Sequence, residues 1–292
     1  MATSPSHKLG QLIGNLLEEV FSPLLQQTAD KSGLYLDVIG KSRKARKGKK
    51  ITWDDAYGNS HDLDFVIEFG GSEEVIGRPV AFIESAWRRY TKHSKNKAQE
   101  IQGAILPIAE KYYVECPFKG AILAGEFTDA SLEQLRSCGF TVLYVRYESI
   151  VGAFSNGAEI DISFGEDTPE GDLSRKVSLI ESLSAEKMNK VKSEIIRDNS
   201  GEIDLFMGLI KEKTEKVVDY ISITPLYGKP ELFDDINKAK EFILTYDVSN
   251  VPENQEFNRF VITLKYINGD KIEASFSSVK ALNAFLCAII QN

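Results

Sequence analysis

Two neighbouring segments, residues 61–69 and 79–87, carry acidic side chains inside strand-like apolar patterns. In the first, HDLDFVIEF, polar and apolar residues alternate, which places Asp62 and Asp64 on one face of a predicted strand. The opposite face is apolar and consists of Leu63, Phe65 and Ile67. The second segment, PVAFIESAW, is an apolar run that is interrupted by Glu84. A turn between the strands predicts a hairpin, which would bring the two acidic sides together.

The segments around this hairpin predict alternating helices and strands. An amphipathic helix covers residues 8–27, and Ser94 caps a second helix, in which Pro107 kinks or ends the first part. Its apolar stripe consists of Ala98, Ile101, Ile105 and Ile108. Residues 120–128, 129–139 and 140–150 then form a strand, a helix capped by Asp129 and ended by Gly139, and a strand. This β-α-β order predicts parallel pairing of the later strands.

We therefore predict an α/β fold with a mixed sheet flanked by helices in residues 1–165. The acidic, turn-rich segment 165–174 marks the end of this domain. Residues 166–215 are predicted to be a largely polar helical linker that bridges two lobes. Residues 216–292 are predicted to form a small α+β domain for recognition or dimerisation, with a hairpin turn at Asn268-Gly269.

Length and composition exclude several classes of protein. The chain has 292 residues, 42% of them hydrophobic, which is enough for a packed core without disulfides. Its three cysteines lack metal or disulfide spacing, and this favours a reducing cytoplasm. We find no signal peptide and no apolar run of transmembrane length, so we expect neither export nor a membrane span.

The basic residues are concentrated in two clusters, although the net charge is −8. The net charge excludes a protein that coats nucleic acid through its overall field. Residues 41–50 read KSRKARKGKK, a run that is also typical of a solvated loop. Because both clusters flank the acidic strands, we predict that they contact a phosphate backbone through Lys41, Arg43, Lys44, Arg46, Lys47, Arg88, Arg89, Lys92, His93 and Lys95.

The acidic side chains are of the type that binds a hard divalent cation. Mg²⁺ needs only one or two protein carboxylates when water and a substrate phosphate complete its shell. Asp64 and Glu84 are the predicted ligands, and Mn²⁺ would substitute for Mg²⁺. Asp62 shares a strand face with Asp64 and is the alternative ligand. A Glu in the middle of an apolar strand is rarely buried without a partner or a metal.

The order of these segments resembles the PD-(D/E)xK nuclease superfamily, to which many restriction endonucleases belong. The resemblance covers roughly residues 8–164, with Asp64 as the motif Asp and Glu84 in the (D/E)-x-K position. It implies a restriction-endonuclease-like fold. It also assigns the family's early helical Glu to Glu18, with Glu19 as the alternative.

The sequence departs from the family where the motif Lys should stand, because that position is Ala86. In some members the catalytic group lies on the following helix. The resemblance then implies Lys97, with Lys92 and Lys95 as alternatives, as the residue that positions the attacking water. Glu100 would support a second metal or hold Lys97.

These expectations describe a cytoplasmic, Mg²⁺-dependent DNA endonuclease of restriction or phage-defence type, acting as a homodimer on duplex DNA. Ala86 and the acidic net charge leave a second hypothesis, a degenerate nuclease fold that only binds nucleic acid or a partner protein. A third hypothesis is a structure-selective nuclease that cuts junctions or flaps.

Overall fold

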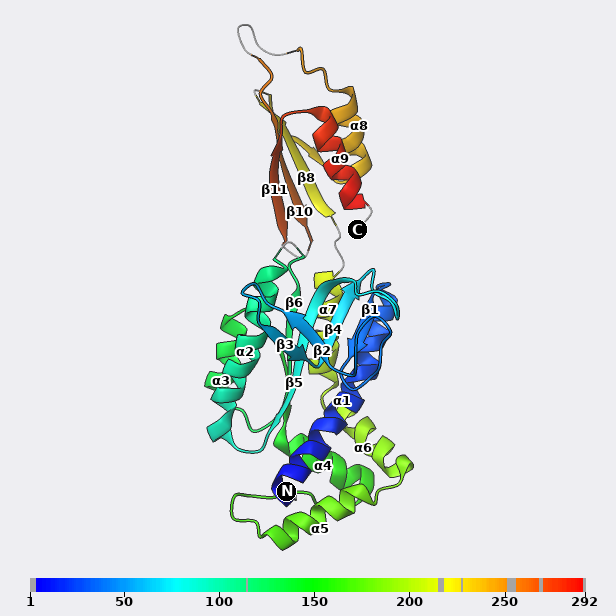
Figure 1. Cartoon of the computed structure of the whole chain (residues 1–292), viewed down its shortest axis with the longest axis vertical. Helices are drawn as coiled ribbons and strands as arrows, with labels where there is room; N and C mark the ends of the chain where they lie inside the picture. Colours follow the sequence, from blue (N-terminus) through cyan, green and yellow to red (C-terminus); the bar gives the residue numbers. More distant parts are fainter. Residues whose placement is uncertain are drawn as a thin grey trace. The chain divides into compact units, whose positions relative to one another are not determined.

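The chain folds into two compact units, Met1–Thr214 and Glu215–Asn292 (Figure 1). The computed structural model describes residues 4–113, 115–214, 218–226, 228–250, 256–267 and 270–290. Each unit contains a sheet and a hydrophobic core of its own. No helix within these ranges is long and apolar enough to cross a membrane.

The first unit is built on a mixed five-stranded sheet in the order β1-β4-β5-β6-β7. The strands are β1 (Tyr35–Val38), β4 (Phe65–Phe69), β5 (Arg78–Arg88), β6 (Phe118–Gly125) and β7 (Thr141–Arg146). β1, β4 and β5 pair antiparallel, whereas β5, β6 and β7 pair parallel. The predicted hairpin and the predicted β-α-β unit therefore belong to one sheet, as expected.

Helices cover both faces of this sheet (Figure 1). On one face lie α2 (Ser94–Lys111) and α3 (Asp129–Ser137). On the other lie α1 (Pro5–Lys31), α4 (Tyr147–Ala158) and α7 (Ser200–Thr214). Successive side chains of β5 point to opposite faces of the sheet. Phe82 and Ala86 pack into one core, and the other core contains Ala81, Ile83 and Trp87. The predicted α/β class with helices flanking a mixed sheet is confirmed.

The prediction that residues 166–215 form a linker between lobes is wrong. α5 (Glu170–Glu181), α6 (Ala185–Asp198) and α7 belong to the first unit and share the core beneath α1. α5 and α6 are polar overall, and each of the three helices buries an apolar stripe. The stripes contribute Leu173, Val177, Ile180, Val191, Ile195, Ile203, Phe206 and Ile210 to that core. The first domain is therefore longer than the predicted residues 1–165 and extends to Thr214.

The predicted strand 61–69 is divided at Asp64. β3 (Ser60–Leu63) pairs with β2 (Ile51–Asp54) in a separate hairpin, whereas β4 joins the main sheet. Leu63 consequently packs with α2 and Phe65 packs with α1, although simple alternation assigns them to one face. The pairing partners change at Asp64, and this change reverses the direction in which the following side chains point.

Several local predictions need smaller corrections. The helix α2 continues through Pro107 to Lys111, because the buried stripe of Ile105 and Ile108 holds it against the sheet. Thr128, not Asp129, caps α3: its hydroxyl accepts a hydrogen bond from the Ser131 N–H, at 3.2 Å. Gly139 ends that helical turn with φ 78°, as predicted.

The predicted strand 140–150 is shorter in the structure, because β7 ends at Arg146 and α4 begins at Tyr147. The Tyr147 hydroxyl is tied to the backbone of Phe164, and this contact anchors the start of the helix. A short 3-10 helix, η1 (Thr91–His93), precedes α2.

The second unit is an antiparallel sheet in the order β11-β10-β8-β9, packed against two helices. Its strands are β8 (Val218–Pro225), β9 (Glu231–Phe233), β10 (Phe260–Tyr266) and β11 (Lys271–Phe276). Its helices are α8 (Ile236–Thr245) and α9 (Val279–Ile290). The predicted α+β architecture is confirmed. The predicted Asn268-Gly269 turn lies outside the described residues, between paired strands in which Lys265 is opposite Lys271.

Candidate functional site

The predicted metal ligands lie side by side where β4 begins. β4 and β5 pair with Phe65 opposite Ile83, so the same register extended by one residue places Asp64 opposite Glu84. Glu84 is on the face of β5 that carries Phe82 and packs beneath α2. The negative charge of Asp64 raises the pKa of Glu84, so the two carboxyl groups lie close enough to interact electrostatically.

Glu84 is a buried carboxyl group with unused hydrogen-bonding capacity. It is 9% exposed, and its Oε1 has no hydrogen-bond partner among the described residues. Burial first and the negative charge of Asp64 second raise its pKa to about 8, while Lys97 acts in the opposite direction. An unpaired carboxylate is costly in such a place, so a cation or a proton must compensate its charge.

Asp64 is held in one orientation by Ser85. The backbone N–H and the hydroxyl of Ser85 both donate to Asp64 Oδ2, at 2.8 and 3.1 Å. Burial raises the pKa of Asp64, against the opposing effects of Ser85 and of the positive charge of Lys97. Within the described ranges no hydrogen bond engages Oδ1, which leaves that oxygen available to a ligand.

Lys97 is the basic residue that the structure brings to this pair. Its side chain is 19% exposed on the first turns of α2, and its charge lowers the pKa of both Asp64 and Glu84. Glu100 holds it through an ion pair of 3.3 Å. Glu100 also lies 3.7 Å from Arg88. Ala86 is buried on the same face of β5 as Glu84 and carries no functional group.

The two alternatives to Lys97 have other surroundings. Lys92 is exposed and forms an ion pair with Glu166 at 2.7 Å. Lys95 is exposed at the start of α2.

Glu18, on α1, is half-buried and lies within electrostatic range of Asp64. Burial, followed by the charges of Asp64 and Glu19, raises its pKa to about 6. Glu19 instead points to the surface, where it pairs with Lys192 at 2.6 Å. Of these two residues, Glu18 is the one whose pKa is affected by the charge of Asp64.

Asp62, the alternative ligand, is engaged elsewhere. Lys50 Nζ and the Thr52 hydroxyl both donate to its carboxylate, at 2.6 and 2.7 Å, on the exposed side of the β2–β3 hairpin. The hydrogen bond from Lys50 is the largest cause that lowers its pKa. Asp64 is therefore better placed than Asp62 to bind an ion beside Glu84.

The residues present fit a hard divalent cation bound by few protein ligands. Glu84 offers a buried oxygen that no described residue bonds, and Asp64 offers a second carboxylate oxygen beside it. Across the described residues, no three His, Cys, Asp or Glu side chains are grouped closely enough to hold an ion together. This arrangement suits Mg²⁺, which keeps several waters and takes further ligands from a phosphate.

The first basic cluster separates into buried arginines and exposed lysines. The prediction that Arg43 and Arg46 contact phosphate is wrong, because their side chains are 1% and 10% exposed and bind Asp37. Arg43 also forms a two-pronged ion pair with Glu68, at 2.7 and 2.9 Å. The predicted contacts Lys41, Lys44 and Lys47 are exposed, with Lys44 paired to Glu74.

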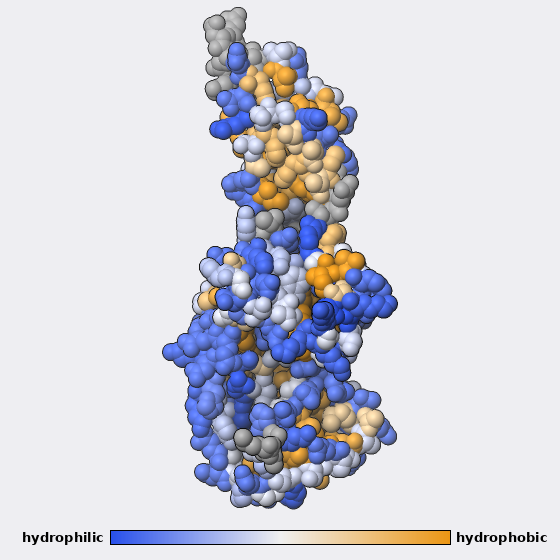
Figure 2. All heavy atoms as spheres, in the orientation of Figure 1, coloured by the Kyte–Doolittle hydropathy of each residue, from blue (hydrophilic) through white to orange (hydrophobic). Residues whose placement is uncertain are grey.

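The second basic cluster also divides. Arg89 turns inward, where it donates to the Phe164 carbonyl and lies 3.8 Å from the centre of the Tyr147 ring. Its predicted phosphate contact is therefore not supported. Arg88 is half-buried, while Lys92, His93 and Lys95 are exposed on a face where the surface over α2 and α3 is mostly hydrophilic (Figure 2).

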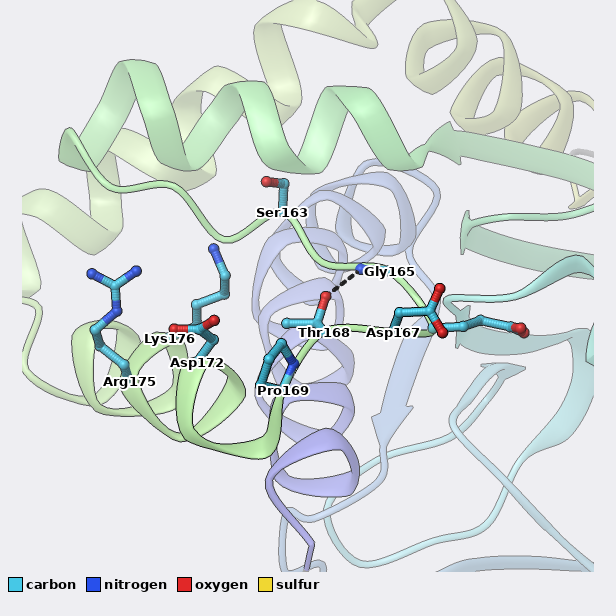
Figure 3. Close-up of a pocket in the computed structure, with 9 residues that line it drawn as sticks. Ser163, Gly165, Asp167, Thr168, Pro169, Asp172, Arg175 and Lys176 are labelled. Carbon is cyan, nitrogen blue, oxygen red and sulfur yellow. Dashed lines mark hydrogen bonds between the residues drawn. The ribbon is translucent and has the colours of Figure 1, made fainter.

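A shallow pocket lies apart from the carboxyl groups, between the loop 163–169 and the start of α5 (Figure 3). In that loop the Gly165 N–H donates to the Thr168 hydroxyl at 2.7 Å. Asp167, Asp172 and Arg175 lie around the pocket. None of the predicted site residues lines it.

The sequence did not predict the roles of Ser85 in the site or of two acids that bind the basic cluster. Ser85 was missed, although a hydroxyl residue directly after an acid in an apolar strand is a detectable signal. The acids Asp37 and Glu68, which hold the arginines, were also missed as partners. Glu68 has the same apolar context as Glu84, so sequence pattern alone cannot separate the paired acid from the unpaired one.

Comparisons with known proteins identify no family. No protein-family model matches the chain, and no curated protein shows significant similarity to it. Among solved structures, the chain is similar to the crystal structure of AF1548, a protein of unknown function, with 11% identity and a TM-score of 0.29. That match covers 64% of this chain and 99% of the other.

Proposed function

We propose that the chain is a Mg²⁺-dependent endonuclease that hydrolyses phosphodiester bonds in DNA, in restriction or phage defence. The observation that carries the proposal is the buried Glu84 carboxyl near Asp64 and Lys97, because its Oε1 has no hydrogen-bond partner in the part of the chain that the structure describes. Two carboxylates can hold the metal ion, and a nearby lysine can offset the charge that develops on the phosphate, so these groups suit metal-assisted phosphoryl hydrolysis. The motif resemblance to PD-(D/E)xK nucleases, with Lys97 in place of the motif lysine, supports the same reaction.

Each residue has a distinct part in this proposal. Asp64 and Glu84 would hold Mg²⁺ or Mn²⁺, with Ser85 fixing the orientation of Asp64. The bound ion would supply a water of lowered pKa and offset the phosphate charge. Lys97 orients the attacking water and stabilises the charge that develops on the phosphate, and Glu100 holds Lys97 in place. Glu18 adds negative charge behind Asp64.

The partner and the compartment are part of the proposal. Duplex DNA presents two antiparallel strands, so a two-fold homodimer would place one site at each scissile bond. The cysteines at positions 116, 138 and 287 are free thiols, which fits a reducing cytoplasm.

The test is cleavage of supercoiled plasmid with Mg²⁺ or Mn²⁺ by the wild type, Asp64→Asn, Glu84→Gln and Lys97→Met. Each substitution should reduce the rate by at least about 100-fold, because it removes a group that acts in the transition state. Glu133→Gln is the matched control: it neutralises an exposed acid on α3 and should leave the rate unchanged. Equal cleavage by the wild type and the three site variants would exclude this site.

Ala86 favours a second candidate, a nuclease fold that binds nucleic acid or a partner protein without cutting. In that case the wild type would bind DNA but cleave none of the plasmid, linear or branched substrates with either metal. Cleavage of junctions or flaps alone would instead identify a structure-selective nuclease.

A further inference from the structure

The loop of residues 41–50 is fixed to the strand segment that contains Asp64; we call it the lysine loop. Before it, the Ile39 N–H donates to the Asp64 carbonyl at 2.9 Å. After it, Ile51 pairs with Leu63 in the β2–β3 hairpin. The base of the loop is closed by a hydrogen bond of 2.9 Å from the Gly40 N–H to the Lys49 carbonyl. The residues that flank the loop on both sides are therefore bonded to Asp64 or to its neighbour Leu63.

The arginines of the lysine loop hold its shape from within. Arg46 binds both oxygens of Asp37 at 2.9 Å and also donates to the carbonyls of Lys41 and Gly48, at 2.9 Å each. Arg43 donates to Asp37, Glu68 and the carbonyls of Ser72 and Val75. These contacts join opposite ends of the loop to one another and to the buried acids.

The lysines of the same loop point outward. Lys41, Lys47 and Lys49 are exposed and form no ion pair with any described residue. Lys44 and Lys50 are exposed too, but pair with Glu74 and Asp62. The planar, multidentate guanidinium groups thus serve the interior, while the compact ammonium charges remain available to an anion.

We propose that the lysine loop is a preordered surface that binds the phosphate backbone of duplex DNA beside Asp64, through Lys41, Lys47 and Lys49. The inference rests on the proposed nuclease function and identifies the surface that binds the substrate. The chain has a net charge of −8, so a polyanion can approach only where the charge is locally reversed, as in this loop. A loop that is already ordered loses little conformational entropy on binding, which strengthens a contact made by few charges.

The test compares two triple variants in which three exposed lysines are replaced by glutamine. One is Lys41→Gln, Lys47→Gln and Lys49→Gln; the matched control is Lys31→Gln, Lys190→Gln and Lys229→Gln, with the same change in net charge. Binding to a fluorescent DNA duplex is measured by anisotropy in EDTA across a range of salt concentrations. Thermal melting of each variant checks that the fold is intact, and it should be, because the replaced ammonium groups of the loop pair with no described acid.

The loop variant should bind at least about tenfold more weakly than the wild type. Its log–log salt dependence should be shallower by about one for each phosphate group that the loop no longer neutralises. The control should retain wild-type affinity. The proposal is overturned if the loop variant binds like the wild type, if the control weakens equally, or if the wild type prefers an RNA duplex or binds no duplex. Because EDTA removes divalent metal, these results are independent of cleavage, so failure of the nuclease assay alone would contradict only the proposed reaction.

Discussion

Glu68 and Glu84 show how differently the same residue type is used in neighbouring strands. Both are buried acids in apolar strand segments. Glu68 is fully paired with the fork of Arg43, whereas Glu84 keeps one oxygen without a partner among the described residues and has a strongly raised pKa. The charge of Glu68 is thus compensated within the fold, whereas Glu84 keeps an oxygen that a ligand could bind.

The raised pKa of Glu84 predicts a defined pH dependence of stability. The unfolded pKa is near 4.5 and the folded pKa about 8, so the native chain holds a proton that the unfolded chain releases between these values. The contribution of Glu84 to the free energy of unfolding is therefore full below pH 4.5 and is lost as pH rises to 8. For a shift of this size the loss is at most about 5 kcal/mol.

Glu84→Gln, which stays neutral, should escape this loss. We expect its melting temperature in EDTA to exceed that of the wild type by a margin that grows from about pH 5 to about pH 9. Glu18 titrates in the lower part of the same range, so only the difference between variant and wild type isolates Glu84. The exposed Glu133→Gln should show no such trend. A constant difference across the pH range would contradict the assignment.

At the scale of elements, α2 and β1 are held in place by different interactions. α2 packs through a regular apolar stripe, and its sequence periodicity was sufficient to predict it. β1 is only four residues long and was not predicted, because its position depends on pairing with β4 and on ion pairs from a loop. Short β9 was missed for a similar reason, since pairing with β8 defines it.

The Arg43 contacts predict that this edge of the sheet depends on one side chain. Its three guanidinium nitrogens all donate, in five hydrogen bonds to acids and carbonyls. Arg43→Met should lower the free energy of unfolding by about 3–5 kcal/mol, because it leaves Asp37 and Glu68 buried without their partner. Urea denaturation measures the change.

Arg43→Lys should rescue little of this loss, because an ammonium group cannot reproduce the fork. Lys44→Met is the matched control: its exposed ion pair with Glu74 should be worth less than about 1 kcal/mol. A loss in Arg43→Met no larger than in this control would show that the buried network contributes little.

At the scale of the whole molecule, the two units have separate cores. Ile221, Ile262 and Leu264 belong to a core made only of residues from the second unit. The candidate site residues Glu18, Asp64, Glu84 and Lys97 all lie in the first unit. A fragment of residues 1–214 therefore contains every group that the proposed chemistry needs.

We expect fragments 1–214 and 215–292 each to fold when expressed alone, since each buries its own apolar surface. Circular dichroism and cooperative thermal melting would show this. Truncation at residue 165, the boundary expected from sequence, should instead give an unfolded or aggregated fragment, because it exposes the core that α5, α6 and α7 cover. A cooperative melt of fragment 1–165 would contradict the observed division.

The sequence alone determined the longer strands, most helices and the two carboxylates, because these follow from local periodicity and from an acid placed in an apolar strand. Residues 79–87, for example, form an apolar run interrupted by Glu84 and Ser85, a pattern that fits a strand covered on both faces. The choice between Asp62 and Asp64 and between Glu18 and Glu19 remained open at that level.

Only the tertiary structure decided which charges have partners. It divided the strand at Asp64, turned Arg43 and Arg46 inward, placed Lys97 beside the acids and packed residues 170–214 onto the first unit. The physical reason is that burial and ion pairing depend on residues that are distant in the chain. A basic run looks uniform in sequence, but its arginines and lysines separate once Asp37 and Glu68 are brought beneath it.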